Sequence, residues 1–163
     1  LLTSVEKGIL IGAAVSILLH LWRTSKPHIA VVGRVGETEH FRNVLRHNVT
    51  TCPHVLAVRV DASLYFVNTK YLEEYLLQAV TERPEVKDLV LVCSAVNSID
   101  GSALETIKTL IFDLKTRGID FYMSEVKGPV MDKLLKVGFV EQLGKDHIFL
   151  TTDQAMRFLD CGS

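Results

Sequence analysis

The sequence predicts an α/β fold, with a mostly parallel central β-sheet covered by α-helices and preceded by an N-terminal apolar helix. Runs rich in β-branched residues alternate with amphipathic stretches of helical length, an order typical of strands joined by right-handed crossovers. The run from Asp88 to Val96 is almost continuously apolar, as expected of a strand covered on both faces. The stretch from Gly8 to Trp22 contains no Asp, Glu, Lys or Arg.

We interpret the apolar stretch from Gly8 to Trp22 as the end of a membrane helix. As a helix it would rise about 22 Å, which is less than the hydrocarbon core of about 30 Å. We therefore expect a short or partly truncated last membrane helix, with Trp22 at the interface and Arg23 and Lys26 on the cytoplasmic side. Because the chain does not begin with methionine, we expect it to be a fragment of a longer protein.

Three other interpretations fit this stretch less well. A signal peptide would be followed by a small-residue cleavage site, whereas the chain continues Arg-Thr-Ser-Lys-Pro. An interfacial helix needs a charged face, which this stretch lacks. A core helix docked on the body stays open as an alternative, although a helix that is apolar nearly all round suits lipid better than the flank of a small domain.

The strands of the body are predicted from runs of β-branched and other apolar residues that are bounded by turn signals. They cover residues 28–33, 55–60, 88–96, 119–123 and 147–150. Pro27 marks a short linker before the first strand. The polar segment 37–53 is expected to be irregular, with one helical turn.

The helices between these strands are predicted from apolar residues at helical spacing together with caps and stop signals. The first helix is expected to start at Asn68 or Thr69 and to end before Pro84, and the second to start with a capping box from Ser102 to Glu105 and to end at Gly118. The third is expected to have Pro129 in its first turn and to end at Gly138, and the last to start at Thr152 or Asp153 and to run through Leu159. The result is a layered sandwich of sheet and helices.

Charge and cysteine usage narrow the class of protein. Residues 27–163 contain 15 basic and 18 acidic residues, so the body lacks the basic surface of a nucleic-acid-binding protein. The cysteines Cys52, Cys93 and Cys161 have no CxxC or other metal-ligand spacing, and a reducing compartment is expected. Cys93 is expected to be a buried small hydrophobe. Cys52 and His54 flank a proline, and we interpret this tripeptide as a turn rather than a nucleophile beside its base.

The sequence supports no catalytic site, because GxSxG, the P-loop, GxGxxG and HExxH are all absent. His40 and His47 could share a helix face, but without a third ligand nearby neither a metal nor a cofactor is expected. The segment from Asn97 to Ser102 has a physical claim to function, because it lies where a buried strand ends and a helix begins, and such junctions can hold anions. A helix cap in which Ser102 bonds the amide of Glu105 explains the same residues.

Three segments resemble a known family. The sequence from Ser98 to Leu104, SIDGSAL, resembles the strand-to-helix signature of STAS domains, which are named for sulfate transporters and anti-sigma-factor antagonists. Residues 26–44 resemble the segment that joins the last transmembrane helix to the STAS domain in SulP/SLC26 anion transporters, and residues 8–16 resemble the end of that helix. Together the resemblance covers essentially all of the chain.

The resemblance implies that residues 1–24 end the last transmembrane helix and that residues 25–163 form a cytoplasmic STAS domain. The parent would be a secondary transporter of sulfate, a related inorganic anion or a small carboxylate. The domain would be non-catalytic and would act in assembly and regulation, through contacts with the membrane domain, a second protomer or a cytosolic protein. The expected contact surface consists of Asp100, Gly101, Ser102 and Glu105.

One residue departs from the family pattern. In anti-sigma-factor antagonists the signature aspartate is followed directly by a serine that is phosphorylated, and here that position is Gly101, with Ser102 one place later. Two alternative functions stay open: a free-standing signalling switch of the antagonist type, and a small-ligand sensor that binds a nucleotide or an anion at the strand ends. The apolar helix and Gly101 count against the first, and the missing phosphate loop counts against the second.

Overall fold

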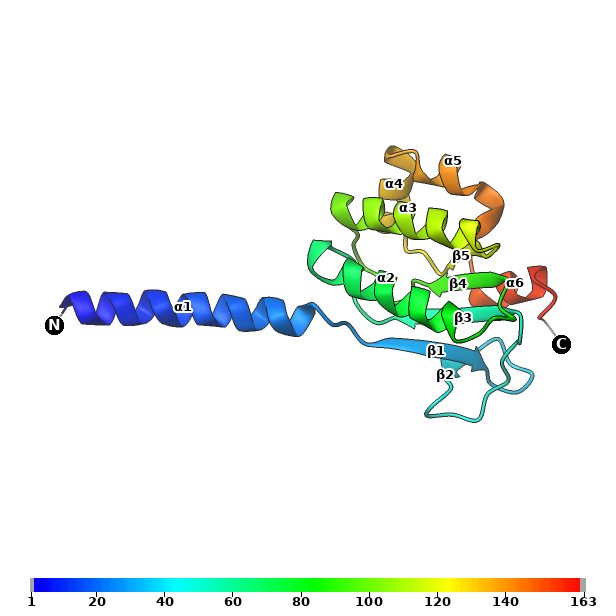
Figure 1. Ribbon diagram of the computed structural model, residues 1–163, viewed down its shortest axis with the longest axis horizontal. Helices are drawn as coiled ribbons and strands as arrows, with labels where there is room; N and C mark the ends of the chain where they lie inside the picture. The colour runs from blue at the N-terminus through cyan, green and yellow to red at the C-terminus, as the bar shows by residue number, and fades with distance from the viewer. Residues whose placement is uncertain (1, 162–163) are drawn as a thin grey trace.

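The structure is a computed structural model that describes residues 2–161, with side chains described from Ser4 onward. A long helix, α1 (Leu2–Thr24), projects from an α/β body, and the two chain ends lie far apart (Figure 1). The body contains a six-stranded mixed sheet with the strand order β2-β1-β3-β4-β5-β6. The strands are β1 (Ile29–Arg34), β2 (Phe41–Asn43), β3 (Val55–Val60), β4 (Asp88–Val92), β5 (Asp120–Ser124) and β6 (Ile148–Phe149).

Strands β3 to β6 are parallel to one another, whereas β1 runs antiparallel to both β2 and β3. The predicted mostly parallel α/β fold is therefore confirmed, with an antiparallel edge. The helices of the body are α2 (Phe66–Thr81), α3 (Gly101–Thr116), α4 (Gly128–Lys136), α5 (Phe139–Leu143) and α6 (Thr152–Phe158), and a 3-10 turn covers Lys145–His147.

The sheet is buried on both faces, as the apolar run in β4 predicts. Alternate residues of each strand point to opposite faces, so Leu89 and Leu91 lie in one core while Val90 and Val92 lie in the other. Helices α2 to α5 cover the larger core, and α6 covers the smaller one.

The strand directions decide which strand ends and helix starts lie at each end of the body. Because β1 is antiparallel to β3, the start of β1 lies at the carboxyl ends of β3, β4 and β5. Helix α1 leaves the body at this end, and the first turns of α2 and α3 lie there too (Figure 1). The amide of Asp61, just after β3, donates to the carbonyl of His28, just before β1, which joins the two segments. We call this the α1 end of the body.

Helix α1 is longer than the uncharged stretch suggests. It spans 23 residues, which corresponds to a rise of about 34 Å and exceeds the hydrocarbon core of about 30 Å. Among the described residues it is the one helix long and apolar enough to cross a membrane. Every side chain from Ser4 to Arg23 is exposed, so the alternative of a core helix docked on the body is wrong.

Several predicted boundaries need correction. Strand β2 lies within the segment expected to be irregular, where it pairs with β1 and has no apolar run of its own. Helix α2 begins at Phe66, and its cap is Tyr65 rather than Asn68 or Thr69. Asn68 lies inside the first turn, where its side chain accepts a hydrogen bond from the amide of Tyr65. The strand in the apolar run ends at Val92 rather than Val96. Thr151 caps α6, one residue before Thr152 and two before Asp153.

Candidate functional site at the start of helix α3

The side chain of Asp100 joins the starts of two helices. Asp100 is the N-cap of α3, and its Oδ1 accepts a hydrogen bond of 2.7 Å from the amide of Ala103. Its Oδ2 accepts a second hydrogen bond, of 3.0 Å, from the amide of Phe66 in the first turn of α2. The amide of Asp100 in turn donates to the carbonyl of Leu64. One carboxylate therefore fixes α2 against α3.

The predicted capping box from Ser102 to Glu105 is wrong. The cap lies two residues earlier, at Asp100, and Ser102 stands inside the first turn of α3. Ser102 is exposed, as is Gly101, while Glu105 pairs with Lys108 at the surface over 2.8 Å. The cap interpretation of this segment is therefore correct in kind, although the residue is different.

The carboxylate also explains why this junction is a poor anion site. Helix N-termini attract anions because their first amides lack partners and the helix dipole is positive there. Here the carboxylate of Asp100 already occupies the first turns of both α2 and α3. An incoming phosphate or sulfate would meet a resident negative charge, which argues against a small-anion site here.

An exposed aromatic residue lies beside the predicted surface. The side chain of Phe66 is 69% exposed, and its amide is bound to Asp100. On the other flank, Lys127 donates a hydrogen bond of 2.6 Å to the side chain of Asn97. The sequence does not reveal the role of Phe66, because an aromatic residue near a helix start is typical of a core position.

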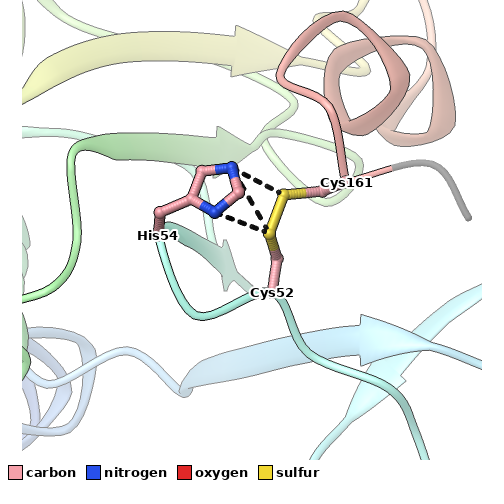
Figure 2. Close-up of side chains that lie close together, drawn as sticks. All are labelled: Cys52, His54 and Cys161. Carbon is pink, nitrogen blue, oxygen red and sulfur yellow. Dashed lines mark hydrogen bonds between the residues drawn. A yellow bond between two sulfur atoms is a disulfide. The ribbon is translucent and has the colours of Figure 1, made fainter.

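A second cluster of polar and reactive side chains lies at the opposite end of the body. Cys52, in the segment before β3, forms a disulfide with Cys161, which follows α6 (Figure 2). The ring of His54 lies beside the bond, with Nδ1 3.5 Å from the Cys52 sulfur and Nε2 3.4 Å from the Cys161 sulfur. The interpretation of Cys52-Pro-His54 as a simple turn is therefore incomplete. The disulfide also differs from the expectation of reduced cysteines.

The free cysteine behaves as predicted. Cys93 is buried, and burial raises the pKa of its thiol to about 12. At neutral pH such a thiol is protonated and unreactive.

The three side chains of the second cluster have the ligand types of a soft metal site, and their ligand atoms lie within 4.8 Å of one another. As long as the two sulfurs are bonded to each other, they offer no thiolate to a metal ion.

Comparisons with known proteins identify the class of this fold. The family model for the STAS domain matches residues 46–155, and the chain belongs to this family. The chain also closely matches the C-terminal regions of sulfate transporters of the SulP/SLC26 family. It is 31% identical to Sulfate transporter 1.3 of Arabidopsis thaliana and 31% identical to High affinity sulfate transporter 2 of Stylosanthes hamata, in each case over 94% of this chain. It covers 25% of each of these proteins.

Solved structures share the fold. The murine Slc26a9 anion transporter in the inward-facing state superposes with a TM-score of 0.84 over 94% of this chain and 25% of its own, at 19% identity. The STAS domain of a SulP transporter from Vibrio cholerae superposes with a TM-score of 0.55 over 72% of this chain and 92% of its own, also at 19% identity. The chain thus spans about a quarter of the sulfate transporters that it matches.

Proposed function

We propose that this chain is the C-terminal part of a SulP-type secondary transporter of sulfate or a related anion. Residues 1–24 end the last transmembrane helix, and residues 25–163 form a non-catalytic STAS domain on the cytoplasmic side of the membrane. The plant relatives named as sulfate transporters support this proposal. So does α1, whose exposed apolar side chains need a partner such as lipid or the rest of a membrane domain.

The position of α1 relative to the candidate surface carries the proposal (Figure 1). Helix α1 leaves from the same end of the body at which α2 and α3 begin. With α1 in the membrane, this end faces the bilayer and the membrane domain of the parent transporter. The proposed contact surface therefore consists of Asp100, Gly101, Ser102 and Glu105, with Phe66 beside them.

This surface acts in assembly and regulation through protein contacts. Phe66 is exposed, and aromatic residues, phenylalanine among them, are enriched in the cores of protein interfaces, where they act as anchors. Its partner is the membrane domain of the same transporter or of a second protomer. Because Gly101 replaces the phosphorylated serine of the antagonists, this contact does not depend on phosphorylation at that position.

The test compares two phenylalanines of equal exposure in the full-length parent transporter. Phe66 at the α1 end is 69% exposed, and Phe112, about 16 Å along α3 from its first residue, is 68% exposed. We expect Phe66→Ser to lower sulfate uptake, or delivery of the transporter to the membrane, at least about tenfold, which corresponds to one lost interface anchor. Phe112→Ser should leave both unchanged.

The outcomes separate the contact from simple misfolding. Thermal unfolding of residues 25–163 should give the same midpoint for the two variants, because both side chains are exposed. Equal uptake by the two variants would contradict the proposed surface. Uptake of no anion at all by the unmodified parent, in membranes where the protein is abundant, would contradict the transporter itself.

A further inference from the structure

The second cluster, formed by Cys52, His54 and Cys161, has features that a purely structural cross-link does not need. The Cα atoms of the two cysteines lie 5.9 Å apart, within the usual range for a disulfide. Nevertheless, both residues are only half-buried, in contrast to Cys93. They line a cavity of about 290 Å³ together with Thr51 and several other side chains. A small molecule can therefore reach the sulfur atoms.

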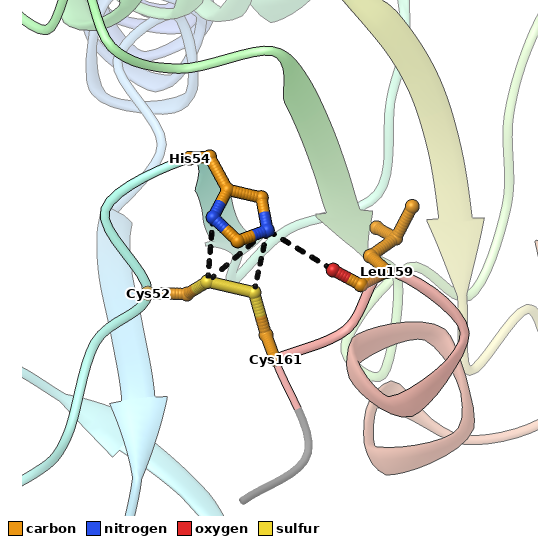
Figure 3. Close-up of a disulfide and its surroundings, with 4 residues drawn as sticks. All are labelled: Cys52, His54, Leu159 and Cys161. Carbon is orange, nitrogen blue, oxygen red and sulfur yellow. Dashed lines mark hydrogen bonds between the residues drawn. A yellow bond between two sulfur atoms is a disulfide. The ribbon is translucent and has the colours of Figure 1, made fainter.

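The contacts of His54 select one tautomer of its ring (Figure 3). Its Nε2 lies 3.1 Å from the carbonyl oxygen of Leu159. A carbonyl oxygen only accepts hydrogen bonds, so Nε2 carries the proton and donates it. Nδ1 is then the basic nitrogen, and it faces the sulfur of Cys52 at 3.5 Å. The backbone carbonyl of His54 accepts hydrogen bonds from the amides of Lys87 and Asp88, which holds the residue in place.

We propose that Cys52 and Cys161 form a reversible thiol–disulfide exchange site, which takes a small thiol of the glutathione class and uses His54 as its base. Exchange requires a thiolate, and an adjacent histidine favours its formation. Nδ1 of His54 occupies that position toward Cys52. Disulfides on the cytoplasmic side of membranes are usually transient, catalytic or redox-sensing. This last point rests on the proposed function, whereas the geometry does not.

Closure of the bond follows from these positions. The thiol of Cys161 exchanges with the oxidised small disulfide RSSR, which gives a mixed disulfide on Cys161 and releases RSH. Nδ1 of His54 then removes the proton from Cys52, whose thiolate attacks the sulfur of Cys161. The leaving RS⁻ takes up the proton. Overall, two protein thiols are oxidised by two electrons, and RSSR is reduced to two RSH.

Opening is the reverse reaction, with two RSH as the reductant. It removes the covalent link between Cys161, after α6, and Cys52, in the segment before β3. The hydrogen bond from His54 to Leu159 does not depend on the bond and can remain. The site thus reports the balance of small thiols and disulfides at the end of the body opposite α1 (Figure 1).

The experiment equilibrates the whole chain, in detergent micelles, with mixtures of reduced and oxidised glutathione at pH 7 and traps free thiols with a maleimide. We expect Cys52 and Cys161 to pass together from thiols to disulfide, with the same half-oxidation ratio from either direction. Cys93→Ala should keep this transition, and Cys161→Ser should abolish it. A disulfide that glutathione opens only in urea would show a permanent cross-link and overturn the proposal.

The role of His54 is tested by rate. His54→Ala should slow exchange at pH 7 at least about tenfold, as expected for loss of a positioned base, while the half-oxidation ratio changes little. Added imidazole should restore more of the rate in this variant than it adds to the unmodified chain, because the cavity admits it. An unchanged rate would remove His54 from the mechanism.

A metal site is the competing use of the same three side chains. Reduced chain mixed with Co²⁺ should show no thiolate-to-cobalt absorption and should still oxidise normally. Absorption that Cys161→Ser removes, together with protection of both cysteines from glutathione disulfide, would overturn exchange in favour of metal binding. None of these measurements depends on anion transport, so their failure and that of the proposed function are distinguishable.

Discussion

At the scale of single residues, Asp100 stabilises the starts of two helices, whereas its place in the STAS signature implies only one. Its two carboxylate oxygens bind amides of two different helices. We expect Asp100→Ala to lower the free energy of unfolding by about 2 kcal/mol, roughly the sum of a lost cap and a second lost hydrogen bond. Asp100→Asn should recover part of this loss, because asparagine also caps helices. Urea unfolding of residues 25–163 measures both changes.

Ser102 provides the control for Asp100. The amide that a Ser102 cap would have bound belongs to the interior of α3, and the side chain of Ser102 is exposed. Ser102→Ala should therefore change the free energy of unfolding by less than about 0.5 kcal/mol. A loss as large as that of Asp100→Ala would show that Ser102 stabilises the start of the helix as much as Asp100 does.

Asp61 lies where α1 joins the body, and it makes stability depend on pH. Burial alone raises the pKa of its carboxyl, but hydrogen bonds from Arg59 and His28 outweigh burial and hold the pKa below its ordinary value. A lowered pKa means that folding favours the charged form. Its contribution is present above the ordinary value of about 3.9 and is lost as the pH falls through the lower, folded-state pKa.

The prediction for Asp61 follows from the direction of its pKa shift. At pH 7, Asp61→Asn should lower the free energy of unfolding by about 1 kcal/mol, and the difference from the unmodified chain should shrink as the medium becomes acidic. Urea unfolding at several pH values measures it, with Asp132→Asn, which changes an exposed carboxylate on α4, as control. A difference that stays constant down to strongly acidic pH would assign the loss to packing.

At the scale of elements, α1 should decide whether the chain is soluble without detergent. Its apolar side chains are exposed along its whole described length, and Trp22 is 71% exposed. We expect residues 25–163 to be monomeric and soluble without detergent, and residues 1–163 to self-associate or to need detergent. Sedimentation velocity compares the two. Equal solubility in plain buffer would contradict the assignment of α1 to the membrane.

The elements also show how far sequence patterns reach. β3 and β4 are predictable because apolar runs fill them, and α3 because its apolar stripe is long. Strand β2 and helix α5 are too short to show a period, and their positions depend on tertiary contacts. The start of α2 is hidden because its cap is Tyr65, a residue type that rarely caps helices.

For the sites, local chemistry is visible in the sequence and long-range pairing is not. The segment containing Asp100 is found from its place after a buried strand, but two residues in it could act as the cap, and only the backbone decides between them. The pairing of Cys52 with Cys161 joins residues separated by 109 positions. Spacing cannot tell which two of three cysteines meet, because that depends on where α6 packs against the sheet.

At the scale of the whole molecule, the two sites occupy opposite ends of one rigid sheet. The Asp100 surface lies at the α1 end, where α3 begins (Figure 1), and the disulfide lies at the other end, next to the start of β3. Apart from the edge formed by the first two strands, the covalent loop closed by Cys52 and Cys161 contains the whole body. A change in this bond therefore acts on the unfolding of the domain as a unit.

The length of that loop predicts how much the disulfide adds to the free energy of unfolding. A cross-link restricts the unfolded chain more as its loop grows, and a loop of roughly 100 residues corresponds to about 4.7 kcal/mol. We expect reduction, or the pair Cys52→Ala and Cys161→Ala, to lower the free energy of unfolding of residues 25–163 by about 4–5 kcal/mol. The urea dependence should become steeper, because an uncrosslinked chain exposes more surface when unfolded. Cys93→Ala, which leaves the loop intact, should not steepen it. A steeper slope without any loss of stability would mean that the bond restrains the unfolded chain but strains the native one by a similar amount.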